Sequence, residues 1–476
     1  MRLTLTVIAL LSSGCASIAS DGGRSDVDLL VRDRLMMPGD APEPIATASD
    51  GSAPSEAIAA LLAQPLTADS AMRVALGSNA RVQASLASLG VARAMVLEAR
   101  AVSNPRAEAE LYFSEGSEMS ADLSVVQSIT SLLYAGRRSS AALAEVEAAK
   151  LDAARDVVEI AFSARRAFLS WQAAAQRAEL TRSVLAASDA AYEAARALHA
   201  SGNFTDLALY GEQDSLERAK IAVHDAELGQ AAAKKALDAA LGLWGTGAKW
   251  TAAIRLPDPG ETAIDIEKIE RESIERNLGL ASLRHSVAAL GSKAGLAAVA
   301  GWIPDIELGV AAKRESEAQP WAVGPRIEIE LPLFYQGAGL SARYEADLLR
   351  LRNLYAAEAV DIRAMAASAA EKTQAGVERV RHQRDVVLPL RTRIVEETQR
   401  SVNAMSSSIF DLLQARRAEI EAGRDYVDAL ERYWMARTEV DQLVAGGGAR
   451  DLSSAPPSMQ DTDQSGASSL ERRGDH

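Results

Sequence analysis

The chain has 476 residues, enough for two or three ordinary domains, and its 48 % hydrophobic content includes only 4 % aromatic residues, so helices packed through small side chains are favoured over a thick aromatic core. The net charge is −14 and no block of basic residues occurs, which argues against a nucleic-acid partner. The single cysteine, Cys15, excludes an internal disulfide.

Residues 1–14 have the features of a secretory signal peptide. Arg2 precedes an apolar run, and small residues lead up to Cys15. This ending resembles a bacterial lipoprotein signal, in which Cys15 becomes the lipidated first residue; an ordinary cleaved signal with a chance cysteine is the alternative. Residues 15–60 are polar and contain several prolines, which predicts an arm or linker, either disordered or docked along the body. No other stretch is apolar enough to predict a transmembrane helix.

Residues 61–245 form the first of two similar units. Thr67 is a plausible N-cap, and Asn104-Pro105 marks a change from helix to strand. Apolar and charged residues then alternate over 107–113, as in a strand with one apolar face and one wet face. The predicted elements are a helix over 68–103, strands within about 105–133 (107–113 and 123–133), and helices over 137–200 and 204–241.

Residues 246–262 read as a connector, and residues 263–446 repeat the same order. The predicted elements are a helix over 264–299, strands within about 303–334, a helix over 337–403, a polar break over 405–408 and a helix over 409–443. The predicted helix over 337–403 has about 65 residues, which as one α-helix is ~100 Å long. Residues 447–476 are predicted to be a flexible tail. Because both halves follow one order, the sequence predicts an internal duplication.

The predicted fold class is mainly α with a small β part. Each half supplies only one hairpin, and a sheet of four strands still has open edges. Three copies would close a twelve-stranded barrel with lipid outside and water inside. A small soluble sheet packed on the helices is the alternative.

Six acids on the polar strand faces are predicted to line the lumen: Glu108, Glu110, Asp305, Glu307, Glu328 and Glu330. Rings of such acids favour the passage of cations, unless the acids serve only as solvated polar residues.

Three motifs resemble the TolC-type outer-membrane efflux channels: Asn104-Pro105, Pro332-Leu333-Phe334 and the run from Phe410 to Arg416. The resemblance covers about Leu66 to Gly447. Two further stretches, at 424–427 and 433–437, resemble the heavy-metal branch of CzcC- and CusC-like proteins.

The resemblance implies a homotrimer whose strands cross the outer membrane and whose long helical hairpins form an α-barrel through the periplasm. It also implies two partners, a periplasmic adaptor and an inner-membrane pump of the RND type. It also implies a closed entrance at the tips of the helical hairpins, formed by Asn203, Phe204, Asp206, Phe410, Asp411 and Gln414. A further entrance acid of some channels corresponds to Gln414, which is neutral. Helix capping is an alternative role for Asp206 and Asp411.

No catalytic motif and no histidines with metal-ligand spacing are found, so we expect neither an enzyme, nor a bound metal, nor a cofactor. The predicted function is a passive export conduit, for heavy-metal cations such as copper, cobalt, zinc or cadmium, or for small organic toxins. Two alternatives remain: a multidrug or type I secretion channel, and a lipid-anchored periplasmic coiled-coil scaffold.

Overall fold

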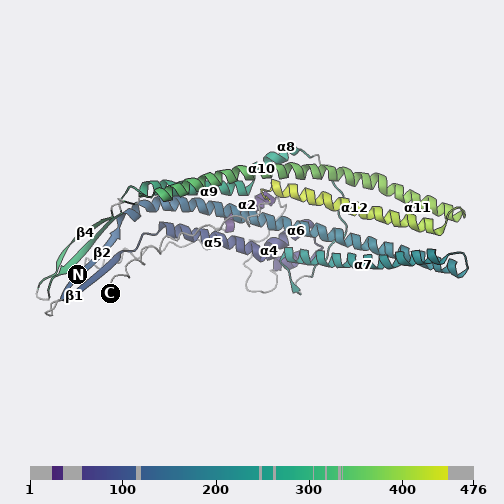
Figure 1. The fold of residues 1–476 in the computed structure, drawn as a ribbon, viewed down its shortest axis with the longest axis horizontal. Helices are drawn as coiled ribbons and strands as arrows, with labels where there is room; N and C mark the ends of the chain where they lie inside the picture. Colours follow the sequence, from purple (N-terminus) through teal and green to yellow (C-terminus); the bar gives the residue numbers. More distant parts are fainter. Residues whose placement is uncertain are drawn as a thin grey trace.

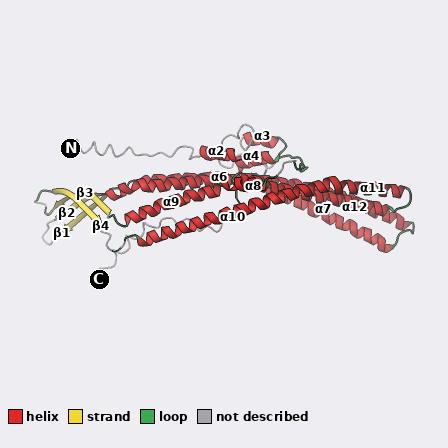
Figure 2. Ribbon diagram, turned by 90° about the horizontal axis from the view of Figure 1, so that it is seen from above, coloured by secondary structure: helices red, strands yellow, loops and turns green. Residues whose placement is uncertain are grey.

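The computed structural model describes residues 24–35, 56–113, 119–245, 249–260, 264–303, 305–316, 319–330, 334 and 336–448. The molecule is elongated. Long helices run side by side for most of its length, the strands gather at one end, and the turns α6–α7 and α11–α12 lie at the other end (Figures 1 and 2). The predicted signal peptide, Cys15 and residues 449–476 lie outside the described residues.

The two halves follow the same order, which confirms the predicted duplication and the mainly α fold with four strands. The first half comprises α4 (Ala68–Ser78), α5 (Ala80–Arg100), β1 (Arg106–Phe113), β2 (Met119–Ser128), α6 (Ile129–Ala200) and α7 (Asp206–Leu241). The second comprises α8 (Ile266–Glu275), α9 (Leu278–Ala300), β3 (Asp305–Arg314), β4 (Ala322–Glu330), α10 (Ala338–His382), the π-turn η2 (Gln383–Val387), α11 (Leu388–Asn403) and α12 (Ile409–Val444). Two short helices, α2 (Arg24–Leu35) and α3 (Glu56–Ala63), precede them.

The first helix of each half is broken by an asparagine, so the predictions of single helices over 68–103 and 264–299 were wrong. The side chain of Asn79 accepts a hydrogen bond from the backbone N–H of Arg81 at 3.0 Å and caps α5. Asn277 accepts from the N–H of Leu280 at 2.8 Å and caps α9. Asparagine competes well for free N–H groups at a helix start, and so it stops one helix and begins the next.

The second strand ends earlier than predicted, since residues 129–133 belong to α6. Ser128 is the N-cap of this helix, and its hydroxyl oxygen accepts a hydrogen bond from the N–H of Ser131 at 3.2 Å. The apolar run 129–133 continues the hydrophobic pattern of the strand, so the pattern alone does not indicate that a helix begins after Ser128. Helix α6 therefore has 72 residues, a length of about 110 Å.

The predicted helix over 337–403 is continuous except for η2. Pro389 follows this π-turn at the start of α11. Proline has no N–H to donate and its ring crowds the carbonyl four residues earlier, so an α-helical turn is costly there. The π-turn changes the backbone hydrogen bonding. The N–H of Leu388 donates to the carbonyl of Gln383, five residues back, whereas an α-helix pairs residues four apart.

The strands form one antiparallel sheet in the order β1-β2-β3-β4. The β2–β3 pair, with Val125 opposite Val310, joins the two halves. Strands β1 and β4 are the edges among the described residues. The register places Leu111, Phe113, Leu123, Val125, Leu308, Val310, Val323, Ile327 and Ile329 on one face. The six predicted acids lie together on the other face.

Alanine and valine dominate the contacts of α6, the central helix. Ala154, Val157 and Ala161 are fully buried in one cluster with residues of α5 and α9. Helix α2 joins this cluster through Val27 and Val31, so the arm is docked at least over 24–35. Within the described parts of the chain, no helix combines the length and the apolar character needed to span a membrane.

Candidate functional site

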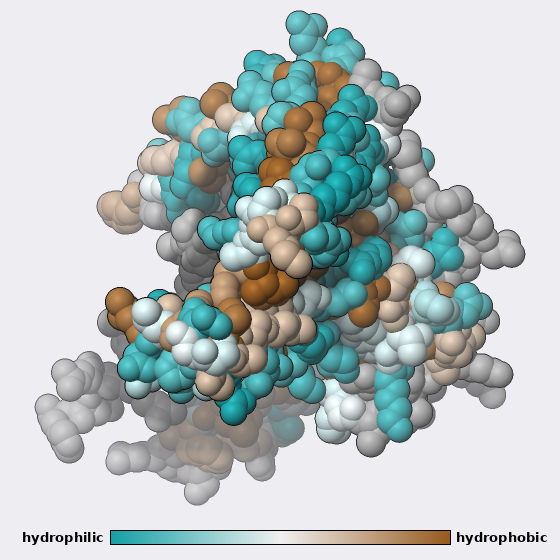
Figure 3. Space-filling view, turned by 90° about the vertical axis from the view of Figure 1, so that its right-hand side faces the viewer, coloured by the Kyte–Doolittle hydropathy of each residue, from teal (hydrophilic) through white to brown (hydrophobic). Residues whose placement is uncertain are grey.

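The tips of the two helical hairpins are built from tight turns and capped helices. Gly202 adopts φ +77° at the end of α6, and Thr205 caps α7 by accepting a hydrogen bond from the N–H of Ala208 at 3.3 Å. At the second tip, Met405 adopts φ +58°, which is unusual for a residue with a side chain. Seen from this end, hydrophobic side chains form separate patches among hydrophilic ones (Figure 3).

The structure brings the two predicted tip phenylalanines together. The rings of Phe204 and Phe410 stack with centroids 4.9 Å apart and an interplanar angle of 20°. Since Phe204 precedes α7 and Phe410 lies in the first turn of α12, this contact joins the ends of the two hairpins. Asn203 supports the first turn, because its side-chain amide donates to the hydroxyl of Ser201 at 3.1 Å.

Asp206 lies in the first turn of α7 and contacts a histidine that sequence reasoning missed. Its Oδ1 is 2.7 Å from Nε2 of His199, in the last turn of α6. The two residues are seven apart in sequence, across a turn whose geometry the sequence did not specify. A second missed contact is the ion pair between Arg417 and Glu212 at 3.2 Å, which joins α12 to α7.

Asp411 forms a capping box with Ser408. The N–H of Ser408 donates to Oδ2 of Asp411 at 2.9 Å, and the N–H of Asp411 donates to the hydroxyl of Ser408 at 3.2 Å. This is the capping role that the sequence left as an alternative. Gln414 is exposed one turn further along α12. A role of these residues at an entrance stays a prediction.

Arginines interrupt the acids on the charged strand face. Arg326 lies 3.4 Å from Glu108 and 3.4 Å from Glu328, and Arg106 forms an ion pair with Glu307. The face still carries more acidic residues than basic ones. Besides Glu108, Glu307 and Glu328 it carries four more acids, and Lys313 is its only basic residue besides Arg106 and Arg326 among the described positions. The four further acids are Glu110, Asp122, Asp305 and Glu330. The same period-two alternation that revealed the acids also places Arg106 and Arg326 on this face.

The connector crosses the middle of the molecule as a strap. Over residues 249–260 its carbonyl groups accept hydrogen bonds from Gln172 and Gln176 of α6 and from Trp434 of α12. Asp258 accepts a hydrogen bond from Tyr426 of α12 and lies 3.4 Å from Arg384 in η2. The strap therefore joins α6 of the first half to α12 and the π-turn of the second.

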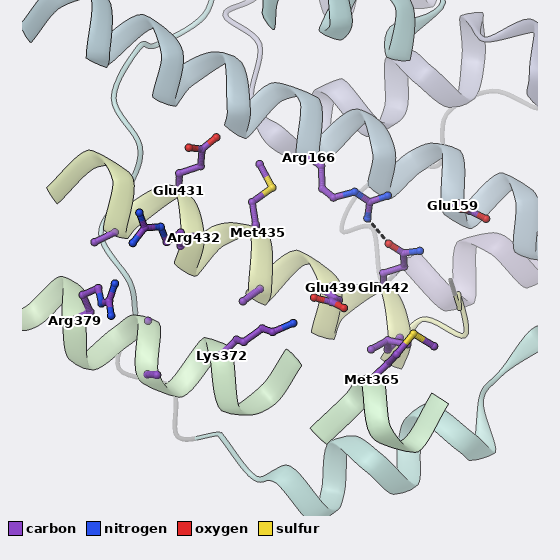
Figure 4. A pocket seen from close by; sticks show the side chains of 15 residues that line it. Glu159, Arg166, Met365, Lys372, Arg379, Glu431, Arg432, Met435, Glu439 and Gln442 are labelled. Carbon is purple, nitrogen blue, oxygen red and sulfur yellow. Dashed lines mark hydrogen bonds between the residues drawn. The ribbon is translucent and has the colours of Figure 1, made fainter. Parts of the chain in front are cut away.

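A cleft of about 690 Å³ lies between α6, α10 and α12 (Figure 4). Arg166 of α6 donates a hydrogen bond to Gln442 there, and Lys372 and Arg379 enter from α10. None of the predicted site residues lines this cleft. Among the described residues, no three histidine, cysteine, aspartate or glutamate side chains form a group that could hold a metal ion.

Comparison with known proteins gives no matching family model and no match among curated proteins. Solved structures do match. The outer-membrane channel OprN is 18 % identical with a TM-score of 0.66, over 87 % of this chain and 98 % of that chain. CusC, described in terms of transmembrane channel formation, is 16 % identical with a TM-score of 0.63, over 80 % and 92 %.

The outer-membrane channel CmeC of Campylobacter jejuni is 13 % identical with a TM-score of 0.65, over 80 % of this chain and 86 % of that chain. The TM-score of CusC is not higher than those of OprN and CmeC, and its identity lies between theirs, so these values do not separate a heavy-metal branch. The chain has the fold of the TolC-type outer-membrane channels.

Proposed function

We propose that three copies of this chain form a passive export conduit across an outer membrane. The two-faced sheet carries the proposal. Its apolar face is open, with Phe113 78 %, Val323 69 % and Ile327 64 % exposed. An apolar outer face suits lipid, and a charged inner face suits water. A sheet packed on helices as part of a soluble core would bury the apolar face.

The sheet edges support the number of copies. Strands β1 and β4 each leave a row of backbone groups without a partner strand among the described residues. Three copies, with β1 of one beside β4 of the next, would make twelve strands and remove the edges. The helices, about 110 Å long in the case of α6, would continue the barrel into the periplasm.

The likeness of fold supports the same reading, since OprN and CmeC are outer-membrane channels. The proposal extends to the partners: a periplasmic adaptor that binds near the tips, and an inner-membrane pump of the RND type that supplies the energy. The conduit opens when the hairpin ends move outward around Asn203 and Ser407. The part of each hairpin that moves extends from the tip to the π-turn before Pro389 and to the strap at Asp258.

Heavy-metal cations are the proposed substrates, and Cys15 is the proposed site of a lipid anchor. The excess of acids on the charged strand face supports cation passage. A conduit does not need to ligate its cargo, so no metal site is required for this function.

Reconstitution tests the conduit. Purified protein should give trimers that dissociate only on heating and a stepwise conductance in planar lipid bilayers. A protein that is monomeric and silent in bilayers would contradict the proposal. For the substrate, a deletion strain should become sensitive to copper, cobalt, zinc or cadmium, whereas sensitivity to organic drugs alone would favour a multidrug channel.

A further inference from the structure

A second cavity lies away from the tips and the sheet, where the N-terminal arm meets the second half. It has a volume of about 620 Å³ and is bordered by α2, α4, α6, α8 and α12. This volume is in the range of small-molecule sites. Helix α2 contributes Arg34 and Leu35 to its wall, and the end of α8 contributes Arg276.

The wall of this cavity is rich in arginine. The basic residues that line it are Arg34, Arg73, Arg165, Lys268, Arg276 and Arg437, and the acidic residues are Asp69, Asp265, Glu272 and Asp441. Guanidinium groups removed from water require an anionic partner or several hydrogen-bond acceptors. The four acids can neutralise only some of these cations.

Most of these acids already pair with a cation or cap a helix. Asp441 contacts two arginines, Arg165 at 3.3 Å and Arg437 at 3.0 Å. Burial raises the pKa of Asp441, and the charge of neighbouring Asp69 adds to the rise. Asp265 accepts a hydrogen bond from the N–H of Lys268 as the cap of α8, and Glu272 lies 3.9 Å from the Lys268 ammonium.

Arg34 and Arg276 remain poorly neutralised. Arg34 donates through Nη1 to the backbone carbonyl of Arg276 at 2.9 Å, and no described carboxylate forms an ion pair with Arg34. Asp33 is the nearest acid to Arg276, at 3.9 Å, and its side chain is 77 % exposed. Burial lowers the pKa of Arg34, and the charge of Arg276 lowers it further.

Buried guanidinium nitrogens in the wall lack a hydrogen-bond acceptor. The Nε atoms of Arg34 and Arg165 are buried, and neither has a hydrogen-bond partner among the described residues. A buried donor without an acceptor costs free energy, which an oxygen of a bound molecule can recover. Guanidinium groups recognise phosphate and carboxylate through paired N–H···O bonds.

We propose that this cavity binds a small molecule bearing a phosphate or carboxylate group, held between Arg34 and Arg276. The ligand would join the N-terminal arm to the start of α9 and so stabilise the docking of α2. The inference does not depend on transport, because every contact lies within one chain.

Isothermal titration of the purified full-length protein tests this, with inorganic pyrophosphate and citrate as probes and glucose as the uncharged control, all at one ionic strength. We expect saturable binding of one anion per chain and none of glucose. Binding of pyrophosphate alone identifies phosphate as the recognised group, and binding of citrate alone identifies carboxylate.

Variants locate the site. Arg276→Gln keeps the backbone carbonyl that Arg34 contacts and removes one guanidinium, so we expect binding weaker by about tenfold or more. Arg34→Lys keeps the charge but loses the paired donors, and should fall between the wild type and Arg34→Gln. Arg381→Gln, at an exposed position of α10 outside the cavity, should bind as the wild type does.

Hydrogen exchange over residues 24–35 gives a second readout, since the bound anion should slow exchange there in the wild type but not in Arg276→Gln. Absence of saturable binding by both anions would overturn the proposal. Equal binding by the wild type, Arg34→Gln and Arg276→Gln would also overturn it, because the anion would then lie elsewhere.

Discussion

The stacked pair Phe204–Phe410 is the contact whose loss should most directly affect opening. The rings join the ends of the two hairpins of one chain with centroids 4.9 Å apart. An aromatic pair of this kind contributes about 0.5–1.5 kcal/mol beyond its burial. If opening separates the hairpin ends, Phe204→Leu should shift the ratio of closed to open tips by about 2- to 13-fold per chain.

Single-channel recording in planar bilayers measures this shift as the fraction of time spent open. Phe204→Leu and Phe410→Leu should each raise it, and the double variant should do no more than one of them, since the contact is already lost. Leu207→Ala is the control, because Leu207 is 83 % exposed at the same tip. Unchanged open fractions in both single variants, or additive effects in the double variant, would refute the reasoning.

Three further predictions concern the caps, the charged face and the sheet. Ser408→Ala and Asp411→Ala should each destabilise the start of α12 by about 1 kcal/mol and raise the leak conductance. Asp411→Asn keeps an oxygen that can cap the helix, so a leak in that variant would show that the negative charge of Asp411 matters at the entrance. Arg326→Ala frees Glu108 and should increase cation selectivity measured from reversal potentials, and unchanged selectivity would place the charged face outside the pore. Gly309→Ala should abolish heat-sensitive trimers, because a Cβ at this position would overlap a backbone carbonyl of β2; normal trimers would mean that the β2–β3 pairing is dispensable.

The sequence predicted the order of elements and the faces of the strands well. Period-two alternation depends only on the pleat, and it placed Glu108, Glu307 and Glu328 on one face as observed. The duplication gave each half a second, independent example of the same pattern. Element boundaries were less predictable, because local capping decided them: Asn79 and Asn277 each break a helix that the apolar pattern would continue.

Contacts between distant segments could not be predicted from one sequence. The Arg326–Glu108 and Arg417–Glu212 ion pairs join residues more than 200 positions apart. The strap is a further example, since nothing near Asp258 indicates that it meets Tyr426 and Arg384. The His199–Asp206 pair depended on a turn at Gly202 whose left-handed conformation sets the distance.

We propose that three chains close one membrane-spanning barrel from four strands each, and electron cryomicroscopy of the purified protein in lipid nanodiscs can show this arrangement. We expect a threefold particle in which β1 of one chain pairs with β4 of the next and Val323 and Ile327 face lipid. A monomeric particle, or a particle in which this apolar face is buried in protein outside the bilayer, would contradict it.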